Sequence, residues 1–189
     1  MIRTRRVPAA VAIAVAVLAL ALAGCGSSSS STKVSPAAYV KSVCTAAGGW
    51  FGSIESAGRR LQTTVHQSKS LAKVKVAYVA FVDELLHATQ QAEQQLKSAG
   101  TPSVNDGKKI SADVINAFDR AQTGLKSAAK EVRKTPTNNA TAFQGAAGGV
   151  QQTVQRALQG MASLAPQKSP QLRAAALKDP SCQRLRSLG

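Results

Sequence analysis

The sequence from Ser35 onward predicts an all-α fold, an up-down-up-down antiparallel four-helix bundle with a short C-terminal helical tail tied back by a disulfide. Three observations predict it. Four segments of similar length carry apolar residues at alternating steps of three and four, the spacing of one helix face. No run alternates apolar and polar residues between turn signals, as a strand would. Two cysteines stand near opposite ends of this region, and short connections favour antiparallel neighbours.

The first two helices are joined by a turn near residues 66–70. Ser35 and Pro36 predict the first N-terminus, because a serine hydroxyl caps a helix and proline suits its first position. Gly100 and Pro102 predict the end of the second helix. The apolar stripe of the first helix comprises Val40, Cys44, Ala47, Phe51, Ile54, Gly58, Leu61 and Val65, and that of the second comprises Leu71, Val74, Tyr78, Phe81, Leu85, Ala88, Ala92 and Leu96.

The third and fourth helices repeat the pattern. Ser103 followed by Asp106 predicts a capping-box variant at the third N-terminus, and Thr135-Pro136 predicts its end. The fourth helix is expected to start among residues 138–141 and to end before Pro166. The stripe of the third helix comprises Ile110, Val114, Phe118, Ala121, Leu125, Ala128 and Val132, and that of the fourth comprises Phe143, Ala147, Val150, Val154, Leu158, Met161 and Ala165.

The cysteine pair supports the same topology. In an up-down bundle, the start of the first helix and the end of the fourth lie at the same end. A helical tail after Pro166 can therefore bring Cys182 back to Cys44, which lies early in the first helix. Within residues 35–189 these are the only two cysteines, and an even pair favours a disulfide if this region is exported, as the N-terminal residues described below indicate. Two buried thiols are the alternative.

Glycine and alanine are unusually frequent inside the predicted helices. If the first and fourth helices are antiparallel neighbours, Gly58 lies level with residues 148–149, and residues 48–49 lie level with Gly160. Facing small residues allow two backbones to approach closely. Missing side chains can also leave a groove for a ligand, so the sequence leaves tight packing and a ligand groove both open.

The first 31 residues have a different composition. Arg3, Arg5 and Arg6 precede an uncharged apolar run over residues 7–23. This run is shorter than the ~20 residues of a spanning helix, but it suits the apolar part of a signal peptide. It ends in Leu22-Ala23-Gly24-Cys25, and Gly26 and five serines follow. These four residues resemble the lipobox of bacterial lipoproteins.

The resemblance implies a processing pathway and a location. A diacylglyceryl group is attached to the Cys25 sulfur, and a signal peptidase cuts between Gly24 and Cys25. Residues 1–24 are then the signal peptide, 25–34 the lipidated cysteine with a flexible Ser-rich linker, and 35–189 the helical domain. The mature protein is expected on the extracytoplasmic face of the cell membrane, held by its lipid. The whole chain loosely resembles small actinobacterial lipoproteins of unassigned function.

The mature chain is strongly basic. Cleavage after residue 24 leaves 21 basic and nine acidic residues, a net charge of about +12. With the chain fixed at Cys25, the turns near residues 66–70 and 134–140 form the end far from the membrane. We name the cations expected at that end, beside Glu131, the basic distal patch: Arg59, Arg60, Lys69, Lys73, Lys75, Lys126, Lys130, Arg133 and Lys134.

Catalytic and cofactor motifs are weak or missing in the sequence. Glu84 and His87 have the Glu-x-x-His spacing of di-iron bundles, but the required second motif is absent and the only other histidine is His66. There is no Gly-rich phosphate loop and no Cys-x-x-Cys pair. We therefore expect no enzyme, no metal and no cofactor. Few aromatic residues and an exported location argue against nucleic-acid binding.

Two functions follow from these features. The first is a non-enzymatic envelope lipoprotein, a binding or scaffold module whose basic distal patch contacts an anionic envelope polymer or a partner protein. The second is a carrier that holds a small apolar or amphipathic ligand in a Gly/Ala-lined interior. A closed helical core would favour the first function, and a continuous apolar cavity would favour the second.

Overall fold

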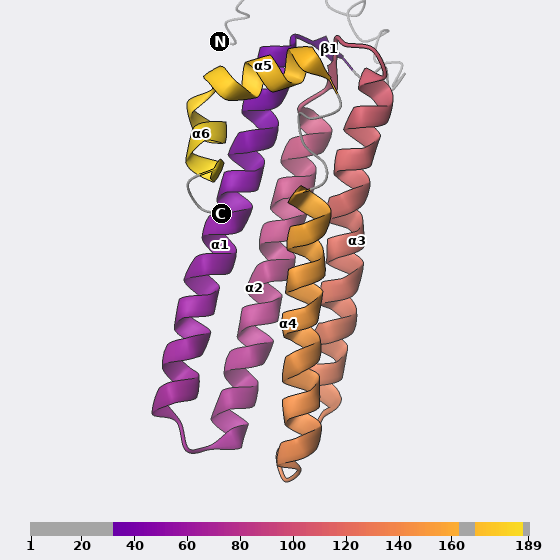
Figure 1. The fold of residues 1–189 in the computed structure, drawn as a ribbon. Helices are drawn as coiled ribbons and strands as arrows, with labels where there is room; N and C mark the ends of the chain where they lie inside the picture. The colour runs from indigo at the N-terminus through magenta and orange to yellow at the C-terminus, as the bar shows by residue number, and fades with distance from the viewer. Residues whose placement is uncertain (1–31, 163–168, 187–189) are drawn as a thin grey trace, which may run out of the picture. The chain divides into compact units, whose positions relative to one another are not determined.

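The computed structural model describes residues 32–162 and 169–186 of the chain. Helix makes up 85 % of these residues, in six helices, as the apolar periodicity predicts. Figure 1 shows four long helices side by side, with α5 running across one of their ends. The described elements are α1 (Pro36–Gln67), α2 (Leu71–Ser98), α3 (Gly107–Lys134), α4 (Ala140–Ala162), α5 (Pro170–Lys178), α6 (Pro180–Arg186), β1 (Lys33–Val34) and β2 (Thr101–Pro102).

Side-chain caps fix the starts of α1, α2 and α4. Ser35 Oγ accepts a hydrogen bond from Ala38 N at 3.2 Å, and Pro36 follows it in the first turn. Ser70 Oγ accepts from the third residue of α2 at 3.5 Å, and Asn139 Oδ1 accepts from the third residue of α4 at 2.9 Å. Each acceptor satisfies a backbone N–H that has no partner inside its helix. The predicted starts of α1 and α4 are confirmed.

The start of α3 differs from the prediction. α3 begins at Gly107, and the residue before it, Asp106, has a left-handed backbone (φ 58°) and makes no side-chain cap hydrogen bond. The predicted capping box at Ser103 is therefore wrong. Ser103 N instead donates to Val34 O at 2.8 Å, because the preceding residues run as strand β2 beside β1.

A parallel sheet of two strands, each two residues long, joins the start of the described chain to the α2–α3 connection. β1 pairs with β2, and Thr101 N donates to Thr32 O at 2.9 Å. Gly100 has φ +78°, and a Cβ there would lie 2.5 Å from Thr32 O, so only glycine fits. The expectation of no strand is wrong here, because residues 33–34, assigned above to the Ser-rich linker, form β1.

The long helices pack in chain order. α1 packs on α2, α2 on α3 and α3 on α4, whereas α1 and α4 are not among the pairs that pack closely. α3, with a neighbour on each side, buries all seven residues of its predicted stripe. In α1, the predicted Gly58, Leu61 and Val65 stay partly or largely exposed, and the helix instead buries Ala46, Trp50 and Ala57 together with Tyr39, Val40 and Cys44.

Aromatic rings hold the centre of the core. Trp50 makes edge contacts with Phe51 and Phe118, with ring centroids 5.3 and 5.6 Å apart. Its indole Nε1 donates to Thr89 Oγ1 at 2.9 Å, and that hydroxyl donates onward to Leu85 O at 2.7 Å. Trp50 and Thr89 are almost fully buried, so the bond satisfies a donor that water does not reach.

Candidate binding groove and surface charges

An apolar groove runs along the side of the domain where α1 and α4 do not pack on each other. It has a volume of about 440 Å³. α2 contributes Tyr78 and Phe81 to it, and α1 and α4 contribute aliphatic and amide side chains. We name it the α1–α4 groove and define it by Gly58, Leu61, Gln62, Val65, Tyr78, Phe81, Val150, Gln151, Val154 and Gln155.

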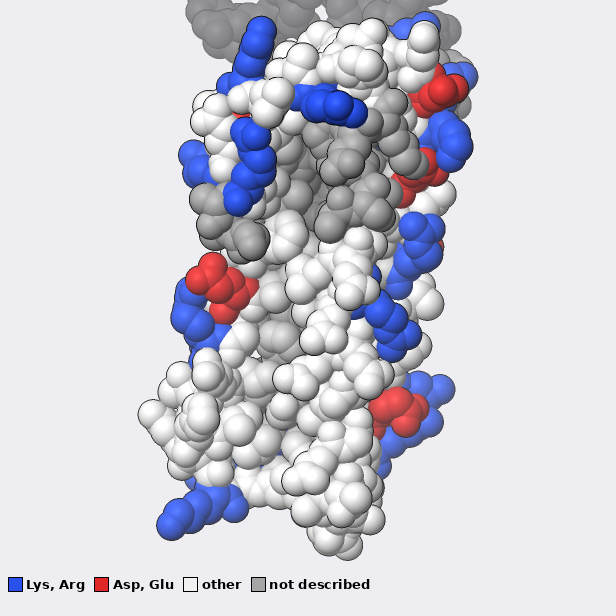
Figure 2. All heavy atoms as spheres, viewed as in Figure 1, with Lys and Arg blue, Asp and Glu red and all other residues white. Residues whose placement is uncertain are grey.

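Among the residues that the structure describes, no charged side chain lines this groove, although the protein is strongly cationic. Its polar side chains are three glutamine amides and the Tyr78 phenol. α4, over its whole length, carries a single charged residue, Arg156. Figure 2 shows the resulting face, on which uncharged side chains cover most of the middle and lower part while charged ones lie along the edges.

One aromatic residue of the groove, Tyr78, also packs against the neighbouring core. The rings of Tyr78 and Phe143 meet edge to face, with centroids 5.6 Å apart, and Phe143 is buried. Burial also raises the pKa of the Tyr78 phenol above its usual value, so this group stays neutral at physiological pH. Val65, at the groove wall, is 39 % exposed and has apolar surface available to a ligand.

The glycines of α1 and α4 do not serve tight helix packing. A Cβ added at any glycine of α1, or at Gly145, Gly148, Gly149 or Gly160 of α4, would meet nothing within 4 Å. Of the two alternatives left open by the sequence, close backbone contact between these residues is therefore wrong. Gly124 of α3 differs, since its Cβ would lie 3.1 Å from Thr153 Cγ2. The close approach occurs between α3 and α4, and the α1 side stays open.

A larger groove, of about 840 Å³, follows the outer seam of α3 and α4. Its lining consists mainly of alanine and glycine together with Arg120, Glu131 and Arg156. Despite its size, it offers a ligand few large apolar side chains and no aromatic ring. The α1–α4 groove is the better candidate site because its aliphatic and aromatic side chains give an apolar ligand more contact.

The structure gives most cations of the basic distal patch a partner. Arg59 pairs with Glu55, Arg60 with Glu84, and Arg133 with Asp83. Lys134 lies 4.0 Å from Glu131, Lys126 Nζ donates to Gln122, and Lys75 Nζ donates to the carbonyls of Arg133 and Thr135 at 2.8 and 2.7 Å. Lys69, Lys73 and Lys130 are exposed, with no carboxylate within ion-pair distance in the described chain.

Two adjacent acidic residues of α2 form ion pairs with the neighbouring helices α1 and α3. Glu84 accepts from Arg60 of α1, and Asp83 accepts from Arg133 of α3. The sequence analysis counted only Glu131 against the patch and missed these carboxylates, together with Glu55. Exposed ion pairs of this kind stabilise a fold by only about 0–1 kcal/mol each. Their main effect is to offset much of the positive charge expected at this end.

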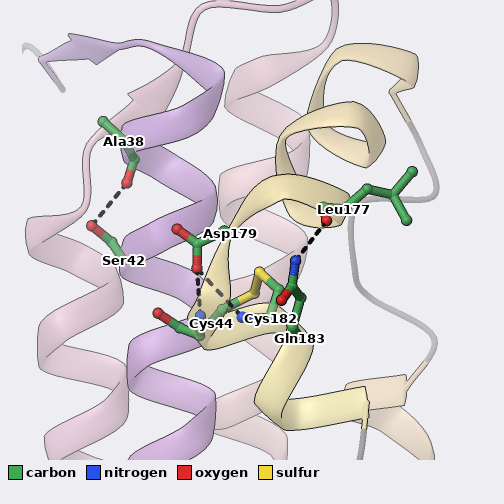
Figure 3. The surroundings of a disulfide bond; sticks show 8 residues. Ala38, Ser42, Cys44, Leu177, Asp179, Cys182 and Gln183 are labelled. Atoms are coloured by element: carbon green, nitrogen blue, oxygen red, sulfur yellow. Dashed lines mark hydrogen bonds between the residues drawn. A yellow bond between two sulfur atoms is a disulfide. The ribbon is translucent and has the colours of Figure 1, made fainter.

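The predicted disulfide is present. Cys44 of α1 and Cys182 of α6 are bonded, 138 residues apart in the sequence, and both are buried. Figure 3 shows the bond beside Asp179, whose Oδ1 accepts from Ser181 N and Cys182 N at 2.8 and 3.4 Å. This capping carboxylate starts α6 and places Cys182 against α1. The alternative of two free thiols is excluded by the S–S bond.

Other candidate groups of the sequence are separate in space or lie outside the described residues. Gly24 and Cys25 of the lipobox precede residue 32 and so lie outside them. Glu84 pairs with Arg60, while His66 and His87 are exposed. Within residues 32–162 and 169–186, no three His, Cys, Asp or Glu side chains gather as a metal ion requires.

No helix in the described ranges combines the length and the apolar character needed to cross a membrane.

The sequence analysis did not single out the glutamines of the groove. Gln62, Gln151 and Gln155 flank apolar stripes, and such amides are ordinary on a solvent-facing helix side. One signal could have identified this face. A surface helix usually carries many charges, and the 23 residues of α4 contain only one.

Comparison with protein-family models, with curated proteins and with solved structures gives no match to this chain.

Proposed function

We propose that this chain is a lipid-anchored, non-enzymatic protein of the extracytoplasmic membrane face that binds an uncharged amphiphile in the α1–α4 groove. In this proposal, the four long helices form an up-down-up-down antiparallel bundle that is open along α1 and α4. The lipobox residues Leu22-Ala23-Gly24-Cys25 support the anchor. The disulfide supports an oxidising compartment, in which such bonds persist.

The observation that supports the binding function is that the described residues of the groove lining are all uncharged. Leu61, Val65 and Phe81 offer apolar surface to a hydrocarbon chain, and the three amides offer donors and acceptors to hydroxyl, ester or amide groups. A carboxylate or phosphate placed there would lose water without gaining a cation, which is unfavourable. A monoacylglycerol therefore fits better than a free fatty acid.

Two leucine substitutions in α1 test this function. Gly58 lines the groove, whereas Gly52 is exposed and is not part of it, and a Cβ at either position meets nothing within 4 Å. Replacing glycine inside a helix by leucine should stabilise both variants by up to about 0.8 kcal/mol. A loss of binding in Gly58→Leu alone then reflects a filled groove and not a damaged fold.

Isothermal titration calorimetry with a monoacylglycerol is the measurement. The wild type and Gly52→Leu should bind alike, and Gly58→Leu should bind about tenfold more weakly. Displacing two methylenes of the ligand costs about 0.8 kcal/mol for each. A fatty acid of the same chain length should bind more weakly than the monoacylglycerol. Equal affinities of the three proteins, or no binding by the wild type, would refute the proposal.

A second candidate is contact between the basic distal patch and an anionic envelope polymer. The exposed Lys69, Lys73 and Lys130 favour it, because no ion pair to a carboxylate is found for them in the described chain. Replacing the three lysines by glutamine should weaken binding to an anionic wall polymer and reduce its salt dependence. Binding that ignores salt, or that survives the triple replacement, counts against this candidate.

A further inference from the structure

A further surface is the end of the domain covered by α5 and α6, residues 170–186, which we name the α5–α6 cap. Its inner side is fixed. Leu172 and Cys182 pack in one cluster with Tyr39 and Val40 of α1, and Val34 of β1 packs against the same cluster. The disulfide holds the cap to α1 covalently. The cap is therefore a rigid surface and not a loose tail.

The outer side of α5 has a regular pattern. Five of its exposed residues recur at helical spacing and form one stripe, and Gln171 is exposed beside it. Leu177, at 55 % exposure, is one of the few large apolar side chains on the described surface, and its carbonyl accepts from Gln183 Nε2 at 3.1 Å, which fixes the corner between α5 and α6. The members of the stripe are Pro170, Arg173, Ala174, Leu177 and Lys178.

The cap that carries this leucine is positively charged. The cap carries four exposed cations and one carboxylate, Asp179, whose Oδ1 is occupied in capping α6. Figure 2 shows Lys and Arg side chains gathered over α5 and α6. The cations are Arg173, Lys178, Arg184 and Arg186. An exposed leucine on a cationic surface is complementary to a lipid bilayer, whose interior is apolar and whose headgroup layer can be anionic.

The point of attachment brings this end to the membrane. The described chain begins at Thr32, whose carbonyl accepts a hydrogen bond from Thr101 N, and β1 lies at the end that the cap covers. Six residues lie between Cys25 and Thr32, and the seven Cα-to-Cα steps from one to the other span at most about 25 Å when fully extended. α1, with 32 residues, is about 48 Å long. A lipid on Cys25 therefore keeps the cap near the bilayer, while the tether is too short to reach the far end of α1.

We propose that the α5–α6 cap docks on an anionic phospholipid bilayer, with Leu177 at the level of the headgroups and the four cations over anionic lipids. This proposal rests on the lipid anchor proposed above, and it adds a second, non-covalent membrane contact. A lipid anchor alone does not set which side of the domain faces the bilayer. A docked cap fixes which end faces the membrane and leaves the α1–α4 groove along the side of the domain accessible.

The test places a tryptophan at position 177 in the full lipidated chain, bound to vesicles that contain brominated lipid. The native chain has one tryptophan, Trp50, which is buried, so the difference from the wild type reports the new residue. Val76, 69 % exposed on α2, gives the matched control Val76→Trp away from the cap. Vesicles rich in phosphatidylglycerol are compared with vesicles of phosphatidylcholine alone.

Leu177→Trp should show blue-shifted, quenched emission on the anionic vesicles only, and Val76→Trp should stay unquenched on both. Adding Lys178→Gln and Arg186→Gln to Leu177→Trp should lower the docked-to-undocked ratio about fivefold for each cation removed. Equal quenching at positions 177 and 76, or equal quenching at 177 on both lipids, overturns the proposal. A chain that does not stay on vesicles at all refutes the anchor, and loss of monoacylglycerol binding is a separate result.

Discussion

Replacing both disulfide cysteines by alanine should lower the stability of the whole domain and not only that of its C-terminal end. Cys44 lies near the start of α1 and Cys182 lies in α6, so the bond encloses nearly the full length of all four long helices. Both cysteines are buried, and alanine avoids placing an unpaired hydroxyl in the apolar cluster that they share with Tyr39 and Leu172.

The separation of 138 residues sets the magnitude. In the chain-entropy treatment, a crosslink closing a loop of this length destabilises the unfolded chain by about 5 kcal/mol at 25 °C, and measured losses are typically 2–5 kcal/mol. For a domain of this size, each kcal/mol shifts Tm by about 2–4 °C. The double variant should therefore melt about 5–20 °C below the oxidised wild type.

Circular dichroism during thermal and urea unfolding measures the effect. The wild type in reductant should approach the double variant, which is the control for effects of the alanines themselves. The urea m-value should rise when the crosslink is lost, because the unfolded chain then exposes more surface. A double variant that melts within about 2 °C of the wild type, with the same m-value, would show that the bond does not constrain the unfolded chain.

Two further predictions concern single side chains. Thr89→Val should destabilise the domain by about 1–3 kcal/mol, because the Trp50 indole N–H is left buried without its acceptor. Thr89→Ser keeps the hydroxyl and should lose less unfolding free energy. The fluorescence of the single tryptophan, Trp50, monitors unfolding of both variants. Equal losses in the two variants would contradict the role of the bond. Burial acts to raise the pKa of Asp179, but hydrogen bonds from Ser181 and Cys182 and the charge of Lys41 outweigh it and lower the pKa below 3.8. The resulting stabilisation is present above about pH 4 and is lost as pH falls through the lowered pKa. The free energy of unfolding of Asp179→Ala, measured in urea, should therefore depend less on pH in this range than that of the wild type. Identical pH profiles of the two proteins would refute this.

The success of the sequence analysis depended on how many neighbours each helix has. For α3, all seven predicted stripe residues are buried, because α2 and α4 cover it from two sides. For α1, the same rule placed Gly58, Leu61 and Val65 in the core, but the neighbour expected on that side does not pack there. Periodicity identifies the apolar face of a helix without showing whether another helix covers it.

Other features were predictable to different degrees. The disulfide followed from two independent signals, an even cysteine pair and a topology that returns the tail to the first helix. The β1–β2 pair did not, because two residues are too few to show alternation, and one of the four is a proline. The carboxylates beside the basic distal patch were missed because Asp83 and Glu84 lie in a different helix from the cations that they bind.

The open side of the domain has a physical cause in the glycines themselves. Burial of apolar surface stabilises helix packing by about 25 cal/mol per Å². Gly58 and the other glycines of α1, like Gly148 and Gly149 of α4, have no side chain to contribute to that area. Packing α4 on α1 would bury little apolar surface, so the free energy gained would hardly offset the conformational entropy lost. α2 and α3 instead pack through large side chains, with Val114 and Phe118 in one core cluster and Leu85 in the other. Two glycine-rich faces can therefore keep a groove open as well as close one, and here Tyr78 and Phe81 of α2 give the open groove an apolar lining.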